Sequence, residues 1–137
     1  MLPEFTFHHI GIATPTLSDT ALYYVNAGYK MSEKIYDPFQ NVNICFLSKE
    51  AMPVIELLEP LDEKSPVTQI IEKSGVSPYH VCYEVDDILS SIVKLKKMKY
   101  ILLFTPIEAI ALENRKICFL FNKHVGLIEL VEKVATS

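Results

Sequence analysis

The chain of 137 residues contains an internal repeat, which constrains its fold more than any other feature. Residues 44–59 read ICFLSKEAMPVIELLE and residues 117–132 read ICFLFNKHVGLIELVE, at an offset of 73 positions. An earlier pair of segments, Phe7-His8-His9-Ile10 and Pro78-Tyr79-His80-Val81, recurs at an offset of 71. Because chance explains one short match far better than two in the same order, the sequence predicts two related modules.

The first module covers about residues 5–60 and reads as a strand, a helix and further strands. Hydrophobic alternation, turn residues and helix caps predict these boundaries. The expected elements are a strand at 6–13, a helix from Thr16 or Ser18 to about Ala27, and strands through Ile35, at 42–47 and at 54–58.

The second module covers about residues 78–133 and follows the same order. It is expected to contain a strand at 79–85, a helix capped by Asp86 or Asp87, and strands at about 100–104, 116–121 and 126–132. A connecting segment, 61–77, contains a helix that Ser65-Pro66 opens and Gly75 closes. The sequence therefore predicts a single α+β domain over residues 1–137, built from two tandem βαβββ modules.

Composition excludes several classes of function. Half of the residues are hydrophobic and the net charge is −4, which gives no electrostatic reason to bind nucleic acid or an anionic membrane, with a local basic patch as the open alternative. The apolar stretch 100–112 is too short and interrupted to span a bilayer, and no signal peptide is visible. An odd set of cysteines within apolar runs, Cys45, Cys82 and Cys118, indicates reduced thiols and a cytoplasmic protein.

The two repeated histidines lie in strands, where residues two apart share a face. His9 shares its face with Gly11 and Ala13, whose small side chains leave room for a ligand. His80 shares its face with Cys82. A lone histidine in a strand is usually structural, so this observation gains weight only from its repetition.

Glu56 and Glu129 occupy matching positions between aliphatic neighbours in the last strand of each module. An unpaired carboxylate is costly to bury, and a divalent cation is the simplest compensation for two that face each other. A pseudo-twofold axis would bring both His–Glu pairs to one centre. Alternatively, both carboxylates face water on a half-exposed antiparallel sheet.

Four segments resemble the vicinal oxygen chelate superfamily, which includes glyoxalase I, extradiol dioxygenases and bleomycin-resistance proteins. They are HHIGIA at 8–13, IELLEP at 55–60, YHVCYEVDDI at 79–88 and GLIELVE at 126–132. The linker at 57–75 is most similar to the methylmalonyl-CoA epimerase branch. The resemblance implies a cupped mixed sheet around one metal site, with the ligands His9, Glu56, His80 and Glu129.

Two stretches depart from the epimerase pattern. Phe39 stands where that branch usually has a catalytic Glu, before Gln40, and residues 107–115 lack the usual Gly-rich loop. By resemblance Glu129 serves as the catalytic base, and Phe39 and Gln40 contact the substrate. The second group that epimerisation usually needs is not evident, and the candidates are Glu56, Gln40, Glu108 and Glu113, of which the last two are expected in a solvated loop.

Two imidazoles and two carboxylates suit one divalent ion of Co, Ni, Zn, Mn, Fe or Mg. The first hypothesis is a metal-dependent isomerase, epimerase or lyase for a small acyl-thioester or α-carbonyl substrate. The alternatives are a lactoylglutathione lyase like glyoxalase I, and a non-catalytic binding or resistance protein in which Phe39 and residues 101–112 line a pocket.

The resemblance also suggests a homodimer. The lysines of 94–99 are expected to form the wet end of a helix, or to meet a CoA phosphate.

Overall fold

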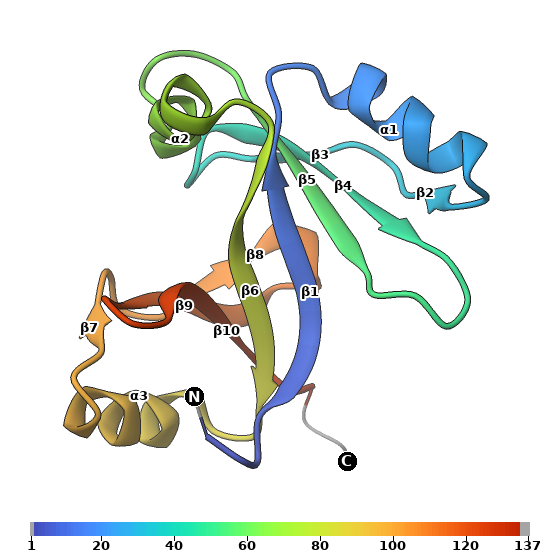
Figure 1. The fold of residues 1–137 in the computed structure, drawn as a ribbon. Coiled ribbons are helices and arrows are strands. Elements are labelled where there is room, and N and C mark those ends of the chain that lie inside the picture. The colour runs from blue at the N-terminus through green and yellow to red at the C-terminus, as the bar shows by residue number, and fades with distance from the viewer. Residues whose placement is uncertain (1, 135–137) are drawn as a thin grey trace. The chain divides into compact units, whose positions relative to one another are not determined.

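The computed structural model describes residues 2–134, and their helices and strands recur in the same order in both halves (Figure 1). The first half contains β1 (Thr6–Ala13), α1 (Leu17–Asn26), β2 (Lys30–Met31), β3 (Ile35–Asp37), β4 (Val42–Ser48) and β5 (Ile55–Pro60). After α2 (Pro66–Ser74) come β6 (Ser77–Val85), α3 (Ile88–Lys97), β7 (Ile101–Leu102), β8 (Ile107–Ala109), a 3-10 turn (Ile110–Leu112), β9 (Arg115–Asn122) and β10 (Gly126–Glu132). The α+β class with mixed strand pairing is confirmed.

The chain divides into two compact units, His9–Tyr79 and the residues up to His8 together with those from His80 onward. In the unit His9–Tyr79, β5 pairs in parallel with β1 and antiparallel with β4. The short strands β2 and β3 pair with the other edge of β4. Helix α1 packs on one face of these strands, over a core of Ile12, Leu17, Ala21, Cys45, Leu47 and Leu57.

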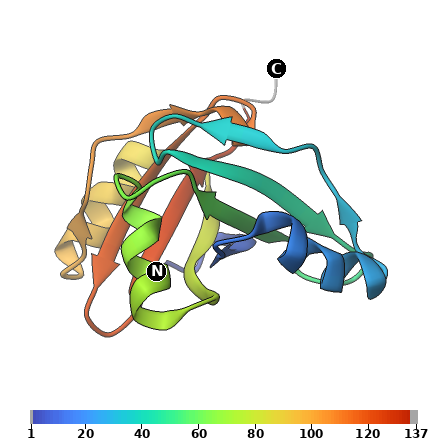
Figure 2. The same cartoon turned by 90° about the horizontal axis from the view of Figure 1, so that it is seen from above.

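The other unit repeats this arrangement. Strand β10 pairs in parallel with β6 and antiparallel with β9, whose other edge carries β7 and β8. Helix α3 lies against this sheet (Figure 2). The core contains Val85, Ile88, Ile92, Leu95, Tyr100, Cys118, Leu120, Ile128 and Leu130.

The strand region that follows each of α1 and α3 is in two short pieces, β2 and β3 in the first unit and β7 and β8 in the second. Between β2 and β3 the Ser32 hydroxyl accepts a hydrogen bond from the Phe46 amide, so a side chain replaces part of the ladder. In the second unit Pro106, which has no N–H to donate, separates β7 from β8. The expectation of a loop at Glu108 is wrong, because Glu108 lies opposite Lys116 in the β8–β9 pair, although its side chain is exposed.

Each of the helices α1 and α3 is tied at its first residue to the last strand of its own module. The Leu17 amide donates to Glu59 Oε2 (2.8 Å) and the Ile88 amide to Glu132 Oε2 (3.0 Å). These acceptors suit the positive end of a helix. Thr16 precedes α1 as expected, but its side chain makes no capping hydrogen bond.

The remaining caps follow the sequence. Asp87 Oδ1 accepts from the amides of Leu89 and Ser90 at the start of α3, and the Ser65 hydroxyl accepts from Val67 at the start of α2. Among residues 2–134, none of the helices is both long and apolar enough to cross a membrane.

Candidate metal site

His9 and Glu56 form a buried pair in the unit His9–Tyr79. Glu56 on β5 lies opposite Gly11 of β1, two residues beyond His9 on the same face. The two side chains meet with His9 Nε2 3.3 Å from Glu56 Oε1, and both residues are buried.

His80 and Glu129 form the equivalent pair in the other unit. Glu129 on β10 lies opposite Cys82 of β6, again two residues beyond the histidine. His80 Nε2 lies 3.2 Å from Glu129 Oε1, and both residues are buried. Each histidine therefore meets the carboxylate of its own module at the same strand register, which the repeat predicted.

The separation within each pair fits two ligands of one metal ion. A charge-assisted N–H···O hydrogen bond is usually about 2.7–2.9 Å long, shorter than the 3.2 and 3.3 Å found here. Two donor atoms about 2.1 Å from a common ion are about 3.0 Å apart in octahedral and about 3.4 Å apart in tetrahedral geometry. The donors present thus suit a divalent cation, and the binding of one ion by both pairs stays a prediction.

A phenylalanine packs beside each histidine ring at matching positions of the repeat. The ring of Phe46 on β4 meets that of His9 edge-on at 5.8 Å, and the ring of Phe119 on β9 is tilted against that of His80 at 5.3 Å. Phe46 lies opposite Glu56 in the strand ladder, as Phe119 lies opposite Glu129. These aromatic neighbours limit the movement of the imidazoles and exclude water from one side of each pair.

The repeated cysteines Cys45 and Cys118 are not candidate ligands. Burial raises the pKa of the Cys45 thiol to about 11, with a further contribution from the Glu56 carboxylate. Burial raises the pKa of Cys118 to about 12, with a contribution from Glu129. Because their pKa values are raised, both thiols remain protonated and inert near neutral pH, whereas a metal ion binds the thiolate.

Phe39 and Gln40, the expected substrate contacts, lie in a turn after β3 that Asp37 holds in place. Asp37 Oδ1 accepts from the Phe39 amide at 2.8 Å, and Asp37 Oδ2 accepts from Gln40 Nε2 at 3.2 Å. Phe39 is 53% exposed, whereas Gln40 is buried and its carbonyl accepts from the Ser65 hydroxyl. The turn is therefore rigid and presents an aromatic ring, and the substrate-binding role of both residues stays a prediction.

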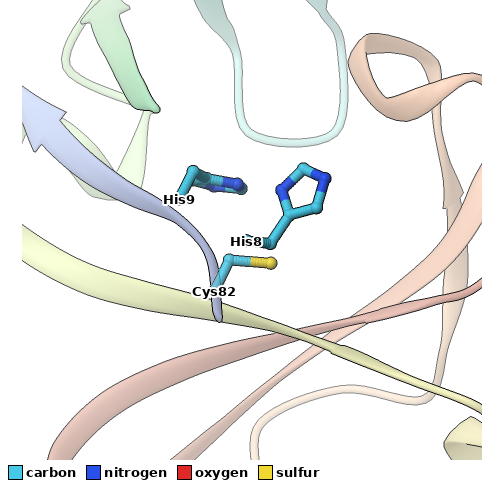
Figure 3. A group of neighbouring side chains, drawn as sticks. All are labelled: His8, His9 and Cys82. Atoms are coloured by element: carbon cyan, nitrogen blue, oxygen red, sulfur yellow. The ribbon is translucent and has the colours of Figure 1, made fainter. Parts of the chain in front are cut away.

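A polar cluster around Arg115 was not anticipated from the sequence. Arg115 donates from Nη1 to Glu84 Oε2 (2.9 Å), from Nη2 to His8 Nε2 (3.2 Å) and from Nε to the Leu112 carbonyl (3.2 Å). A ring nitrogen of His8 and the Cys82 thiol lie within 4.8 Å of each other (Figure 3). The only signal in the sequence was that Arg115 ends the stretch that departs from the epimerase pattern.

The family of the chain follows from comparison with known proteins. A family model described as the Glyoxalase/Bleomycin resistance protein/Dioxygenase superfamily matches residues 8–119. The mitochondrial methylmalonyl-CoA epimerase of Homo sapiens is 32% identical over 90% of this chain and 71% of that protein. The ethylmalonyl-CoA/methylmalonyl-CoA epimerase of Cereibacter sphaeroides is also 32% identical, over 90% of this chain and 94% of that protein.

Solved structures show that the fold is shared. The hypothetical protein BH1468 of Bacillus halodurans C-125 has a TM-score of 0.86 and 29% identity, with 98% of both chains covered. Methylmalonyl-CoA epimerase of Mycobacterium tuberculosis has the same fold, with a TM-score of 0.85 at 24% identity over 98% of this chain and 94% of that one. The chain therefore belongs to the glyoxalase, bleomycin resistance and dioxygenase superfamily, among the relatives of methylmalonyl-CoA epimerase.

Proposed function

We propose that this protein is a metal-dependent epimerase or isomerase that removes a proton from the carbon next to the carbonyl of an acyl-CoA thioester. The observation that carries the proposal is the pair of buried His–Glu couples at equivalent register in the two modules. Relatives named methylmalonyl-CoA epimerase supply the substrate class, and one related structure is described as a complex with methylmalonyl-CoA.

We assign the metal ligands to His9, Glu56, His80 and Glu129. A bound divalent ion would polarise the substrate carbonyl and so acidify the neighbouring C–H bond. Glu129 takes up the released proton on its buried carboxylate, and Phe119, which lies opposite it in the strand ladder, keeps bulk water from competing for that proton. His9 and His80 act as neutral donors whose rings are packed by phenylalanines.

Exchange of the α-proton with solvent tests this proposal. The chelator-treated protein, reloaded with each candidate metal, is incubated with methylmalonyl-CoA in deuterium oxide, and mass spectrometry follows deuterium uptake. We expect metal-dependent uptake, and a loss of about 10²- to 10⁴-fold in Glu129→Gln at saturating metal. Glu108→Gln, which changes an exposed carboxylate, is the matched control. An absence of uptake with every metal would refute the proposal.

The presence of Phe39 predicts that exchange of the α-proton is faster than inversion of the α-carbon. Exchange needs one base, whereas inversion also needs a proton donor on the opposite face, where the epimerase pattern has an acid in place of Phe39. We expect deuterium uptake to outrun the change of configuration, and Phe39→Glu to raise inversion relative to exchange by about tenfold or more. Chiral analysis of the recovered acid measures inversion, and Phe39→Gln supplies polarity without the acid.

A second candidate reaction is the isomerisation of a thiol hemithioacetal, as in glyoxalase I. The replacement of the acid by Phe39 favours it, because a proton can move between adjacent carbons on one face with a single base. Loss of methylglyoxal that depends on glutathione, and that Glu129→Gln abolishes, would select this reaction over epimerisation.

We also propose that the protein is a cytoplasmic homodimer. The three cysteines are free and buried, which fits a reducing compartment. The family resemblance carries the dimer, which light scattering would test as a mass twice the 15.6 kDa of one chain.

A further inference from the structure

A groove of about 500 Å³ lies in the unit that contains His80, beside the C-terminal end of α3. The strand β7 and the turn between β9 and β10 form its other sides. The lining residues are Met98, Lys99, Ile101, Phe121, Asn122, Lys123 and His124.

The floor of this groove is apolar and its rim is basic. Met98, Ile101 and Phe121 are 47%, 62% and 41% exposed, although such side chains are usually buried. Among the described residues that line the groove, the charged ones are the lysines Lys99 and Lys123, and none is acidic. The chain as a whole carries a net charge of −4, so this local positive charge runs against the average.

The equivalent groove in the other unit shows that this composition is not a consequence of the fold. It is lined by Gly28, Lys30, Ser48, Lys49 and Glu50 and has about the same volume, 520 Å³. The strand register is the same in both, because Lys30 lies opposite Ser48 and Ile101 lies opposite Phe121. The polar pair Lys30 and Ser48 of one unit thus corresponds to the apolar pair Ile101 and Phe121 of the other.

The residues on the rim also differ in charge between the two grooves. Lys99 occupies the position of Gly28, and Lys123 occupies the position of the acidic Glu50. Lys99 has φ = 72° and Gly28 has φ = 95°, a left-handed conformation that favours glycine and is strained for a lysine. A lysine held there at an energetic cost points to a role for its charge.

Hydrogen bonds fix the shape of the groove. Asn122 Nδ2 donates to the Met98 carbonyl at 3.2 Å, and Asn122 Oδ1 accepts from the His124 amide at 2.8 Å. These bonds join the end of α3 to the β9–β10 turn, so that Lys99 and Lys123 are presented from a preformed frame.

Apolar side chains lie between the groove and the candidate metal-binding pair of the same unit. Phe119, which packs on His80, and Phe121 lie on the same face of β9, roughly 7 Å apart along the strand. Phe104 packs on Phe119 at 5.5 Å, and the Leu103 amide donates to the Phe119 carbonyl. The β9 face between His80 and the two lysines is therefore lined by apolar side chains.

We propose that this groove binds the nucleotide end of a coenzyme A thioester, with apolar or aromatic parts on Phe121 and Ile101 and phosphates at Lys99 and Lys123. The inference rests on the proposed function for its choice of thioester. The lysines complement the charge of this ligand, since the nucleotide end of coenzyme A is a polyanion. It is attached to a long, weakly polar arm. The groove thus selects CoA thioesters over thioesters of uncharged thiols.

Binding of free coenzyme A to the full-length, chelator-treated protein tests the groove without metal or turnover. Calorimetry compares coenzyme A with pantetheine, which lacks the whole nucleotide end, adenosine and phosphates alike. In Lys99→Ala/Lys123→Ala we expect the Kd for coenzyme A to rise about tenfold at low ionic strength, with no change for pantetheine. The control Lys30→Ala/Lys34→Ala makes the same change of net charge elsewhere and should shift the Kd less than about twofold.

A second variant, Phe121→Ser, installs the residue found at the equivalent position 48 and should weaken coenzyme A binding about threefold or more. Equal losses in the two double lysine variants, or no loss in either, would overturn the proposal. Lysine-dependent binding by a catalytically inactive protein would leave the groove standing and refute the proposed function. Turnover with an unchanged KM and Kd in the double lysine variant Lys99→Ala/Lys123→Ala would overturn the groove proposal and leave the proposed function standing.

Discussion

His9 and His80 hold equivalent positions, each 3.2–3.3 Å from the carboxylate of its own module. If both donate to one ion, His9→Ala and His80→Ala should weaken metal binding by similar factors. We expect a loss of at least about tenfold in affinity from each, since even a change next to a ligand has this effect. Competition with a chromophoric chelator measures the affinity, and elemental analysis should give one ion per chain before mutation.

His124→Ala provides the control for this comparison, because His124 is exposed in the β9–β10 turn and is not among the proposed ligands. The prediction of a shared ion would be wrong if one histidine variant kept full affinity while the other lost it. Two ions per chain, each lost with only one of the histidines, would instead indicate two separate sites.

At the scale of the elements, the ends of α1 and α3 are built alike but carry different residues. Tyr29 and Tyr100 donate their amides to carbonyls five positions earlier, and the residue before each tyrosine has positive φ. A Cβ at Gly28 would meet only ordinary contacts with Lys49, so the positive φ alone opposes a side chain there. Gly28→Ala should therefore destabilise the protein by about 1 kcal/mol. Lys99→Gly should stabilise it by up to about 1 kcal/mol.

Urea unfolding of both variants measures these effects, with Lys97→Gly, inside the last turn of α3, as the control that should be destabilised. Equal and opposite shifts at the equivalent positions would show that Lys99 is kept against stability. A loss of stability in Lys99→Gly would instead mean that the lysine supports the fold, and would weaken its assignment to ligand binding.

The helices, the long strands and the His–Glu partners could be predicted because each depends on local patterns or on the repeat. The partnership of Glu56 with His9, for example, follows from the matching positions of Glu129 and His80 in the repeat. The contacts of Glu59 and Glu132 with helix starts more than 40 residues away could not be predicted, because no local pattern marks such a partner. Short strands such as β8 escaped for the same reason, since they exist only through pairing with β9.

For the molecule as a whole, the duplication places a buried thiol in each core. Cys45 and Cys118 are both fully buried, and their pKa values are raised to about 11 and about 12, first by burial and then by nearby carboxylates. An unfolded chain releases these thiol protons at its ordinary pKa of about 8.5. The folded protein keeps them over a range of more than two pH units, so each thiol links stability to pH.

The sign of this linkage predicts a loss of stability in alkali. Below about pH 8.5 both states hold the protons and the thiols add no pH dependence, whereas above it only the unfolded state is stabilised by ionisation. The free energy of unfolding should fall by about 1.4 kcal/mol per pH unit for each thiol as the pH rises toward 11. Urea unfolding between pH 7.5 and 10, with reductant present, measures this slope.

The double variant Cys45→Ala/Cys118→Ala separates the thiols from other groups that titrate in alkali. Its stability should be lower at pH 7.5, because two buried side chains are truncated, but its alkaline slope should be shallower than that of the parent. The tyrosines Tyr83 and Tyr100, whose pKa values burial also raises, remain in both proteins and cancel in the comparison. Parallel slopes in the two proteins would mean that the thiols ionise in the folded state at their ordinary pKa, and hence that water reaches both cores.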